Sequence, residues 1–217
     1  MIKFLSELVT KERFLKFHKV LDLRTRYITV VLEDLFQTHN ASAVLRTCDC
    51  LGIQDVHFIE NQFFFNENPE VALGSSKWLS LLRYHQYENN TLSTINFLKE
   101  QGYRIVATTP HTNEVSLENL SLSSGKIALL FGSELPGLSD IAMQNADEFV
   151  KIEMYGFTES FNISISVALF LYQLTTKLRN SDINWQLEES EKDELLVKWL
   201  KTSIKDSENI IKQYFKS

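Results

Sequence analysis

The sequence predicts an α/β protein in which a mainly parallel sheet is flanked by helices, with further helices at both ends of the chain. Short runs of β-branched and apolar residues alternate with helical patterns along the middle. Two of these runs, "IVAT" and "IALLF", are apolar throughout, which is typical of parallel strands that helices cover on both faces. All seven glycines and all three prolines lie between Gly52 and Gly156, so we expect the two ends to be helical.

The alternation of strand-like and helix-like runs gives each expected element its place. A first helix is expected over "TKERFLKFHKVLDL" at residues 10–23, with Thr10 as its N-cap. The expected strands span residues 27–33, 56–60, 103–109, 126–132 and 148–153. The expected helices of the middle region span residues 40–52, 91–102 and 139–146. An apolar stripe over residues 190–215 predicts the last helix, with Ser190 as its cap.

The stretch that begins at Phe161 is ambiguous at its start. "FNISISV" alternates apolar and polar residues with a period of two, as a strand does. The following "ALFLYQLTTKL" favours a helix with one apolar face, made up of Ile163, Val167, Phe170, Leu174 and Leu178. We therefore expect a helix, which Ser160 can cap.

The length of 217 residues fits a single domain, with a basic N-terminal helical segment (about 1–26) and a C-terminal helical extension (about 182–217). An apolar fraction of 44% and a charged fraction of 23% are ordinary for a globular protein. The start of the chain carries charges every few residues, unlike a secretion signal, and no uncharged apolar run is long enough to span a membrane. We expect a cytoplasmic protein with no membrane partner.

The net charge of −6 argues against a protein that coats nucleic acid nonspecifically, because such binding depends on basic side chains. The charge is unevenly distributed, however. Residues 1–27 contain seven basic and three acidic side chains, so this end is positive while the remainder is strongly negative. A positive end on an acidic body can still hold a phosphate backbone at one place.

Several kinds of site have no support in the sequence. Cys48 and Cys50 are two residues apart, which points helical side chains to different faces, so we expect buried small residues and no disulfide. The chain has no GxGxxG or GxxxxGK[ST] phosphate loop. It also has no HExxH or clustered cysteines and histidines, and no metal is predicted.

Three segments at predicted strand ends or helix starts carry unusual polar residues, where ligands of open parallel sheets usually bind. "THNASAVLRTCDCLGI" joins Asn40 at a helix start to Arg46, less than two turns later. "LLFGSELPGLS" ends a buried strand in Gly-x-Glu, and "IEMYGFTESFNISISVA" ends another in a loop that contains Ser-x-Asn.

These segments resemble the three motifs of the SPOUT superfamily of RNA methyltransferases, in its TrmH (SpoU) branch. They are similar, in order, to N-x-x-x-x-x-R, to a strand followed by FGxE, and to I-P-M-x-G-x-x-x-S-L-N-x-S-x-A. The match runs across roughly residues 10–180. The stretch "RFLKFHKVLDLRTRYITVVLEDLFQTHNASAVLRTCD" resembles the start of the tRNA guanosine-18 2′-O-methyltransferases.

The resemblance implies a deep trefoil knot, in which the last third of the chain threads through a loop to make a cofactor pocket. It implies S-adenosylmethionine as cofactor, no metal, and a homodimer whose active site draws on both subunits. The implied reaction is methyl transfer to a ribose 2′-OH of structured RNA, and we take tRNA guanosine 18 in the D-loop as the first candidate target. Another tRNA position, ribosomal RNA, or an inactive knotted RNA-binding module remain alternatives.

The resemblance also carries a set of catalytic residues onto this chain. The residues at the matching motif positions are Asn40, Arg46, Glu134, Ser160 and Asn162. Methyl transfer needs removal of a hydroxyl proton and placement of that oxygen against the methyl group. Because an arginine side chain normally stays protonated, we expect Arg46 to bind the adjacent phosphate and to accept the proton only transiently. The two asparagines and Glu134 would hold Arg46 and the loops.

Two further sets complete the predicted site. The residues at cofactor-cradling positions of the family are Thr108, Gly132, Ile152 and Phe161, several of them through the main chain. The candidate RNA contacts are His39, Arg13, Arg24, Lys77 and Arg179. The alternative interpretations are ordinary strand-end residues for the first set and a solvated charged face for the second.

This sequence departs from the family pattern at three places. Glu153 replaces the proline of the third motif, and Phe161 replaces the leucine before its asparagine. Residues 182–217 hold eight acidic and six basic side chains, whereas the C-terminal helices of the tRNA guanosine-18 enzymes tend to be rich in arginine. The mode of RNA binding is therefore open.

Overall fold

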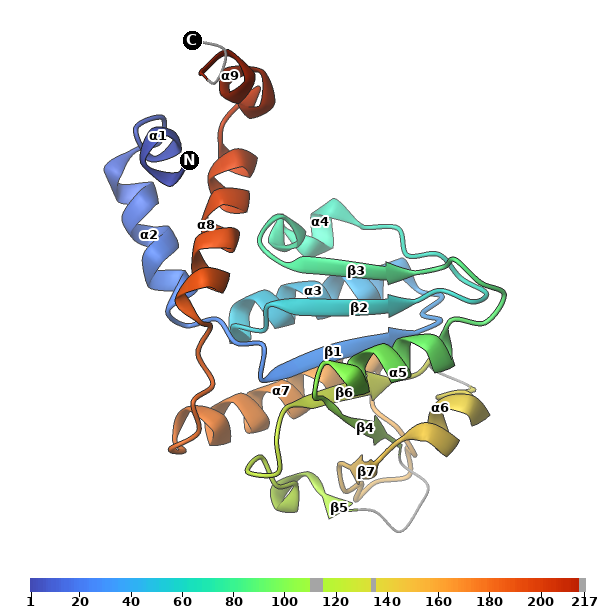
Figure 1. Ribbon diagram of the computed structural model, residues 1–217. Coiled ribbons are helices and arrows are strands. Elements are labelled where there is room, and N and C mark those ends of the chain that lie inside the picture. Colours follow the sequence, from blue (N-terminus) through green and yellow to red (C-terminus); the bar gives the residue numbers. More distant parts are fainter. Residues whose placement is uncertain (110–114, 134–135, 215–217) are drawn as a thin grey trace. The chain divides into compact units, whose positions relative to one another are not determined.

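The computed structural model describes residues 1–109, 115–133 and 136–214 (Figure 1). Its internal contacts divide the chain into two compact units. The terminal unit combines Met1–Thr25 with Gln186–Ser217, and the sheet unit comprises Arg26–Trp185. The predicted helical segments at the two ends of the chain therefore pack with each other. That the whole chain is a single domain stays a prediction.

The sheet unit contains a seven-stranded sheet. Its strands are β1 (Ile28–Glu33), β2 (Asp55–Ile59), β3 (Ser80–Tyr84), β4 (Arg104–Thr108), β5 (Val115–Ser116), β6 (Ile127–Phe131) and β7 (Glu148–Lys151). They lie in the order β3-β2-β1-β6-β4-β7-β5, and each pair of neighbours is parallel. The five predicted strands are confirmed, whereas β3 and β5, which form the two edges, were not predicted.

Helices cover both faces of this sheet, as predicted. The helices of the sheet unit are α3 (Thr38–Leu51), α4 (Pro69–Ala72), α5 (Thr91–Glu100), α6 (Asp140–Asn145) and α7 (Ile163–Arg179), with short 3₁₀ helices η1 (Ser75–Lys77) and η2 (Leu117–Asn119). Helices α3 and α7 pack together on one face, and α5 and α6 pack together on the other (Figure 1). The three helices predicted for this region, together with α7, are therefore confirmed.

The strand sequences explain why both faces are covered. In β1, Val30 and Leu32 belong to the core on the α3 and α7 side, while Val31 belongs to the core on the α5 and α6 side. In β6, Leu129 and Leu130 divide in the same way. A fully buried side chain of this size stabilises the fold by about 1.5–3 kcal/mol. The continuous apolar runs therefore contribute to the core on each face of the sheet.

Helix α7 settles the ambiguous stretch that begins at Phe161. All five residues of the predicted apolar face are buried: Ile163, Val167, Phe170, Leu174 and Leu178. The interpretation as a helix is therefore confirmed. Ile165, the middle apolar residue of the alternation, is 49% exposed, whereas Ile163 and Val167 are buried, as helical spacing requires.

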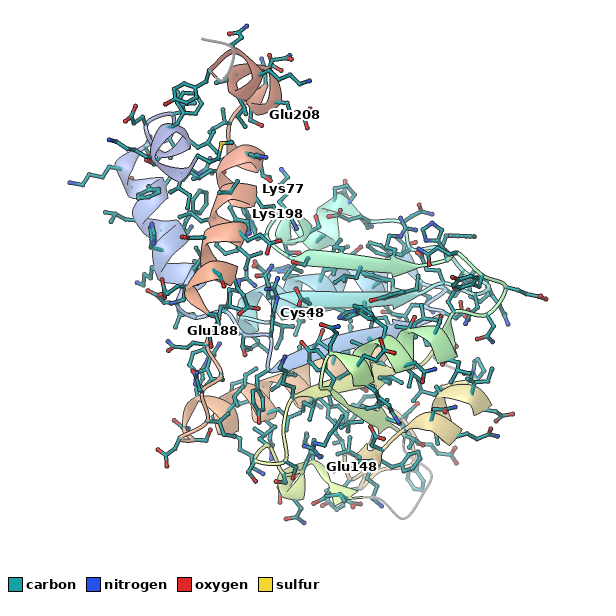
Figure 2. The ribbon with its side chains drawn as sticks, in the orientation of Figure 1. Cys48, Lys77, Glu148, Glu188, Lys198 and Glu208 are labelled. Carbon is teal, nitrogen blue, oxygen red and sulfur yellow. The ribbon has the colours of Figure 1, made fainter. Side chains whose placement is uncertain are left out.

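The terminal unit contains α1 (Ile2–Ser6), α2 (Lys11–Leu21), α8 (Glu189–Ser203) and α9 (Ser207–Tyr214). The side chain of Thr10 caps α2 as predicted, accepting a hydrogen bond from the amide of Arg13 at 3.2 Å. The prediction that Ser190 caps the last helix is wrong. Glu188 precedes α8 and forms a capping box with Glu191 (Figure 2).

The last predicted helix is broken into two. Helix α8 ends at Ser203, and α9 begins at Ser207. Between them Asp206 has a φ of 59°, in the left-handed region that an uninterrupted helix cannot contain. The apolar stripe over residues 190–215 gave no signal of this break.

The two cysteines have different environments. Cys48 is buried on the core side of α3 (Figure 2), as predicted, whereas Cys50 is exposed. The expectation of burial is wrong for Cys50, because two residues turn a helix by about 200°. Both thiols are free, so the expected absence of a disulfide between them agrees with the structure.

In the part of the chain that the structure describes, no helix combines the length and the apolar character needed to cross a membrane.

A buried histidine predicts how stability changes with pH. Burial lowers the pKa of His57 from 6.5 to about 4, and its Nδ1 lies 2.9 Å from the Tyr84 hydroxyl. Burial and the charge of Asp55 raise the pKa of Tyr84 to about 12, so this hydroxyl stays protonated near neutral pH. Because the unfolded chain binds a proton to His57 first, stability should be lost as the pH falls from 6.5 towards 4.

We expect the His57→Gln variant to lack this part of the pH dependence. Between about pH 7.5 and pH 5, the unfolding free energy of the unsubstituted protein should fall by about 2 kcal/mol more than that of the variant. Urea unfolding at the two pH values measures the difference. Parallel changes in the two proteins would show that His57 does not contribute.

Candidate functional site

A cleft of about 860 Å³ opens at the C-terminal ends of β4, β6 and β7. Its wall is formed by the end of β4, the end of β6 with the turn that follows, Met143 of α6, and the segment from β7 into α7. Ligands of open parallel sheets usually bind at this edge, and small-molecule pockets usually enclose about 300–1,000 Å³. The wall includes all four residues predicted to bind a cofactor: Thr108, Gly132, Ile152 and Phe161.

The described residues of the turn after β6 that line the cleft are Gly132, Ser133, Pro136, Gly137 and Leu138. Ser133 and Gly137 exchange two backbone hydrogen bonds of 3.2 and 3.0 Å, which close the turn. A Cβ atom on Gly132 would lie 2.1 Å from the carbonyl carbon of Gly137, so only glycine fits at this position. The motif glycine is therefore required by the close approach of two backbone segments.

The side chain of Thr108 is engaged by the neighbouring strand. Its hydroxyl donates a hydrogen bond of 2.8 Å to the carbonyl of Leu130 in the neighbouring strand. The side chain is thus used to join β4 to β6 at the edge of the cleft. That several cofactor positions act through main-chain groups stays a prediction.

Asn162 is the N-cap of α7. Its Oδ1 accepts hydrogen bonds from the amide (2.9 Å) and the hydroxyl (2.6 Å) of Ser164. The prediction that Ser160 caps this helix is wrong, because a cap must directly precede the first helical residue. Ser160 instead lies in the wall of the cleft, beside Asn162.

The same Asn162 side chain joins α7 to α3. Its Nδ2 donates a hydrogen bond of 3.1 Å to Oδ1 of Asn40, which is only 5% exposed. Asn40 in turn donates from Nδ2 to Oε1 of Gln37 at 2.8 Å. The two motif asparagines, distant in sequence, therefore form one amide chain that fixes the starts of both helices.

Arg46 lies on a different face of α3 from Asn40. Its side chain is exposed, as is that of His39. A separation of seven positions in the sequence places both on one helical face, about 10 Å apart along the axis. Neither residue belongs to the wall of the cleft. Among the described residues no hydrogen bond joins Arg46 to either motif asparagine, and Glu134 lies outside the described residues. That these residues hold Arg46 stays a prediction.

The basic residues predicted to contact RNA have unequal access to solvent. Arg13 is exposed on α2, and Lys77 is exposed on η1 (Figure 2). Arg179 is exposed, but Nη2 donates to the carbonyl of Leu51 at 2.9 Å, and its guanidinium lies 5.7 Å from the centre of the Trp185 ring.

Arg24 does not have the accessibility that an RNA contact needs. It is 1% exposed, and its guanidinium lies 5.5 Å from the centre of the Trp199 ring. The stacked, buried cation stabilises the terminal unit. We correct the prediction accordingly and leave Arg24 out of the candidate RNA contacts.

Five of the described polar residues in the cleft wall were not among the predicted site residues: Thr109, Ser133, Lys151, Glu159 and Ser166. Glu159 directly precedes Ser160, and Ser166 lies one helical turn after Asn162. Once the start of α7 is known, helical spacing places Ser166 on the same side as its cap. The sequence alone left the first residue of α7 ambiguous. The helical spacing between Asn162 and Ser166 could therefore not be used to predict that Ser166 faces the cleft.

The wall combines apolar rings with polar groups. Phe131, Phe161 and Phe170 supply the rings, while Ser160, Asn162 and the turn after β6 supply hydrogen-bonding groups. This combination suits a ligand with a flat ring system and polar edges. Within residues 1–109, 115–133 and 136–214, no group of three or more histidine, cysteine, aspartate or glutamate side chains could hold a metal ion.

The model of the SpoU rRNA methylase family matches residues 27–172 of this chain. The matched range contains the whole sheet, the cleft and more than half of α7.

Two relatives are similar over most of the chain. A protein of Borreliella burgdorferi named tRNA (guanosine(18)-2′-O)-methyltransferase is 46% identical over 205 residues, which cover 94% of this chain and 92% of the relative. A protein of the same name from Thermus thermophilus is 33% identical over 164 residues, which cover 76% of this chain and 82% of the relative.

Solved structures share the fold. The TrmH/SpoU tRNA modifying enzyme of Aquifex aeolicus superposes with a TM-score of 0.79 at 26% identity, over 90% of this chain and 98% of that one. An AdoMet-bound rRNA methyltransferase of Sinorhizobium meliloti superposes with a TM-score of 0.60 at 22% identity, over 72% of this chain and 58% of that one. The second likeness concerns the fold alone.

Two substitutions test which residue caps α7. Asn162→Ala removes the cap and the bond to Asn40, so we expect the unfolding free energy to fall by about 2 kcal/mol. Ser160→Ala should change it by less than about 0.5 kcal/mol, because Ser160 does not cap the helix. Urea unfolding of both variants is the measurement. Equal losses would contradict the assignment.

Proposed function

Because this chain belongs to the SpoU rRNA methylase family, we propose that it is an S-adenosylmethionine-dependent 2′-O-methyltransferase acting on guanosine 18 in the D-loop of tRNA. The family resemblance seen in the three motifs is thereby confirmed. The observation that carries the choice of substrate is the extensive similarity to the Borreliella burgdorferi enzyme, which is named for this reaction.

The cleft fits the proposed cofactor. S-adenosylmethionine has a flat adenine ring with polar edges, which matches a wall of phenylalanine rings and main-chain groups. When bound, it supplies a methyl group on a positively charged sulfur, ready for attack by a ribose oxygen. The residues that would hold it are Thr108, Gly132, Ile152 and Phe161.

Arg46 has the position expected of a group that meets the RNA rather than the cofactor. It is exposed, lies outside the cleft wall, and shares a helical face with His39. A guanidinium stays charged near neutral pH and recognises phosphate in a forked geometry. We therefore assign to Arg46 the phosphate next to the target ribose and a transient part in removal of the hydroxyl proton.

The remaining motif residues would position these groups. The bond between Asn40 and Asn162 fixes the start of α3 against the start of α7, so the helix that carries Arg46 is held next to the cleft. Ser160 would contribute from the cleft wall, and the role of Glu134, which lies outside the described residues, is proposed from the motif alone. His39, Arg13, Lys77 and Arg179 remain the proposed RNA contacts, and tRNA modification implies a cytoplasmic enzyme.

The exposed side of α7 supports a homodimer. Four large apolar side chains recur along it at helical spacing and are each 41–68% exposed: Phe161, Ile165, Leu169 and Tyr172. A continuous exposed apolar stripe of this kind marks an interaction surface. We assign it to a second copy of the chain, because it begins at the cleft wall, where the family resemblance implies that two subunits share a site.

The proposal includes the trefoil knot that the family resemblance implies. Helix α6 packs with α5, whereas α7 packs with α3 on the other face, so the chain changes face after β7 (Figure 1). A knot requires this crossing segment to pass through the loop that follows β6. An experimental chain trace with the segment outside that loop would contradict the knot.

Mass spectrometry of tRNA incubated with the protein and S-adenosylmethionine tests the reaction. We expect 2′-O-methylguanosine at position 18, and a fall in turnover of about 100-fold or more in Arg46→Lys. Cofactor affinity should change by less than about twofold in this variant, because Arg46 is not part of the cleft. Arg83→Lys is the matched control, since Arg83 pairs with Glu60 outside the proposed machinery.

The other outcomes distinguish the alternatives. Methylation at another tRNA position or in ribosomal RNA would keep the chemistry and change the substrate. Absence of both cofactor binding and methylation would favour an RNA-binding module without activity. An Arg46→Lys variant that keeps most of its turnover would contradict the role given to Arg46.

Sedimentation analysis tests the dimer. Leu169→Asp places a charge in the apolar stripe, and we expect it to weaken dimerisation at least about 100-fold, because an unpaired charge would be buried. Leu92→Asp on α5 is the matched control, with 43% exposure against 41% for Leu169. Equal sedimentation of both variants and the unsubstituted protein would contradict the assignment of the stripe.

A further inference from the structure

Glu33, the last residue of β1, carries a buried carboxylate that is not part of the cleft wall. It is 2% exposed. Leu32 pairs with Phe131 in the neighbouring strand, so Glu33 lies beside Gly132, where the turn after β6 begins. A buried acidic side chain is costly unless donors surround it, which makes its hydrogen bonds informative.

Three donors surround this carboxylate. Oε1 accepts hydrogen bonds from the hydroxyls of Thr91 (2.6 Å) and Ser139 (2.7 Å). Oε2 accepts a hydrogen bond from the backbone amide of Ser139 at 2.8 Å. Two of the three donors thus belong to a single residue, which is held by both its side chain and its main chain.

Ser139 lies where the turn after β6 ends. It is the N-cap of α6, and its hydroxyl also accepts a hydrogen bond from the amide of Ala142 at 3.1 Å. The residues just before it, from Pro136 to Leu138, form part of the cleft wall. The position of Ser139 therefore fixes the C-terminal end of this segment of the wall.

The turn is fixed at its beginning by the pairing of β6 with β1 and by the two bonds between Ser133 and Gly137. At its end it is held by Glu33. Without the carboxylate, Ser139 would lose both of its hydrogen bonds to β1, and the residues from Pro136 to Leu138 would be less restrained at their C-terminal end. They would then have to be ordered when the ligand binds, which lowers affinity.

We propose that Glu33 is a positioning residue for cofactor binding, which holds the turn after β6 in the conformation that forms the cleft wall. The inference rests on the proposed function, because the ligand whose affinity should change is S-adenosylmethionine. Glu33 acts through Ser139 and does not touch the ligand.

Glu60 provides a contrast within the same sheet. It directly follows β2, is 4% exposed, and its carboxylate accepts hydrogen bonds from Arg83 and from the amide of Phe65. None of these partners belongs to the cleft wall. Glu33 and Glu60 are therefore two buried carboxylates at adjacent strand ends, only one of which holds the turn.

The test compares Glu33→Gln with Glu60→Gln in the full-length protein. Glutamine keeps the size of the side chain but replaces one acceptor oxygen with an amide that donates. In Glu33→Gln we expect the Kd and the KM for S-adenosylmethionine to rise about tenfold or more, with kcat and the KM for tRNA within about twofold. In Glu60→Gln the melting temperature should fall, with the Kd for S-adenosylmethionine unchanged within about twofold.

A second pair of variants covers the case in which Glu33→Gln does not fold. Ser139→Ala removes the hydroxyl but keeps the backbone amide, so it should raise the Kd in the same direction. Ser139→Thr keeps the hydroxyl and should restore affinity to within about threefold of the unsubstituted protein. In the combined variant of Glu33→Gln with Ser139→Ala, the two effects should be less than additive.

Calorimetry with S-adenosylmethionine separates the two levels of the proposal. If the unsubstituted protein binds the cofactor and Glu33→Gln binds it equally well, the role of Glu33 is wrong while the proposed function stands. A loss of affinity in Glu33→Gln no greater than that in Glu60→Gln would also overturn it. If the unsubstituted protein does not bind the cofactor at all, the proposed function fails and this inference with it.

Discussion

The parallel pairing of the sheet is the constraint on which the candidate site depends. Because neighbouring strands run in the same direction, the segments that follow β1, β4, β6 and β7 all emerge at one edge. The three sequence motifs begin in these segments. Their proximity is therefore a consequence of strand direction, which the apolar cores on both faces maintain. The wall of the cleft consists mainly of the strand ends, the turn after β6 and the segment that leads from β7 into α7.

Hydrogen bonds to buried polar groups add directional restraints at this edge of the sheet. The core packs α3 and α7 together and includes Ala41 and Ile163 from their first turns. The hydrogen bond that the Asn162 side chain donates to Asn40 adds a directional restraint between these turns, and the hydrogen bonds from Ser139 to Glu33 add one at the end of the turn after β6. Directional bonds of buried groups are costly to leave unmade, so they select one arrangement among several that would bury similar apolar area.

The sequence was sufficient for the parts of the fold that depend on local pattern. Five strands, the main helices and the apolar face of α7 follow from periodicity, and the motif resemblance correctly indicated the family. The edge strand β3 was missed because its residues are only partly buried and its sequence "SLLRY" lacks a continuous apolar run. The capping roles of Ser160 and Ser190 were wrong because a cap depends on where the backbone becomes helical, and adjacent polar residues compete for that place. Arg24 could not be recognised as buried, since the ring that covers it comes from Trp199, far along the chain.

The two functions of Asn162 restrict what can replace it. Its oxygen must accept from the first turn of α7 while its nitrogen donates to Asn40. Aspartate would keep the acceptor and lose the donor, serine would not reach both partners, and glutamine would displace the amide by one methylene. Among these side chains, only asparagine has the acceptor, the donor and the length that both helices require at position 162.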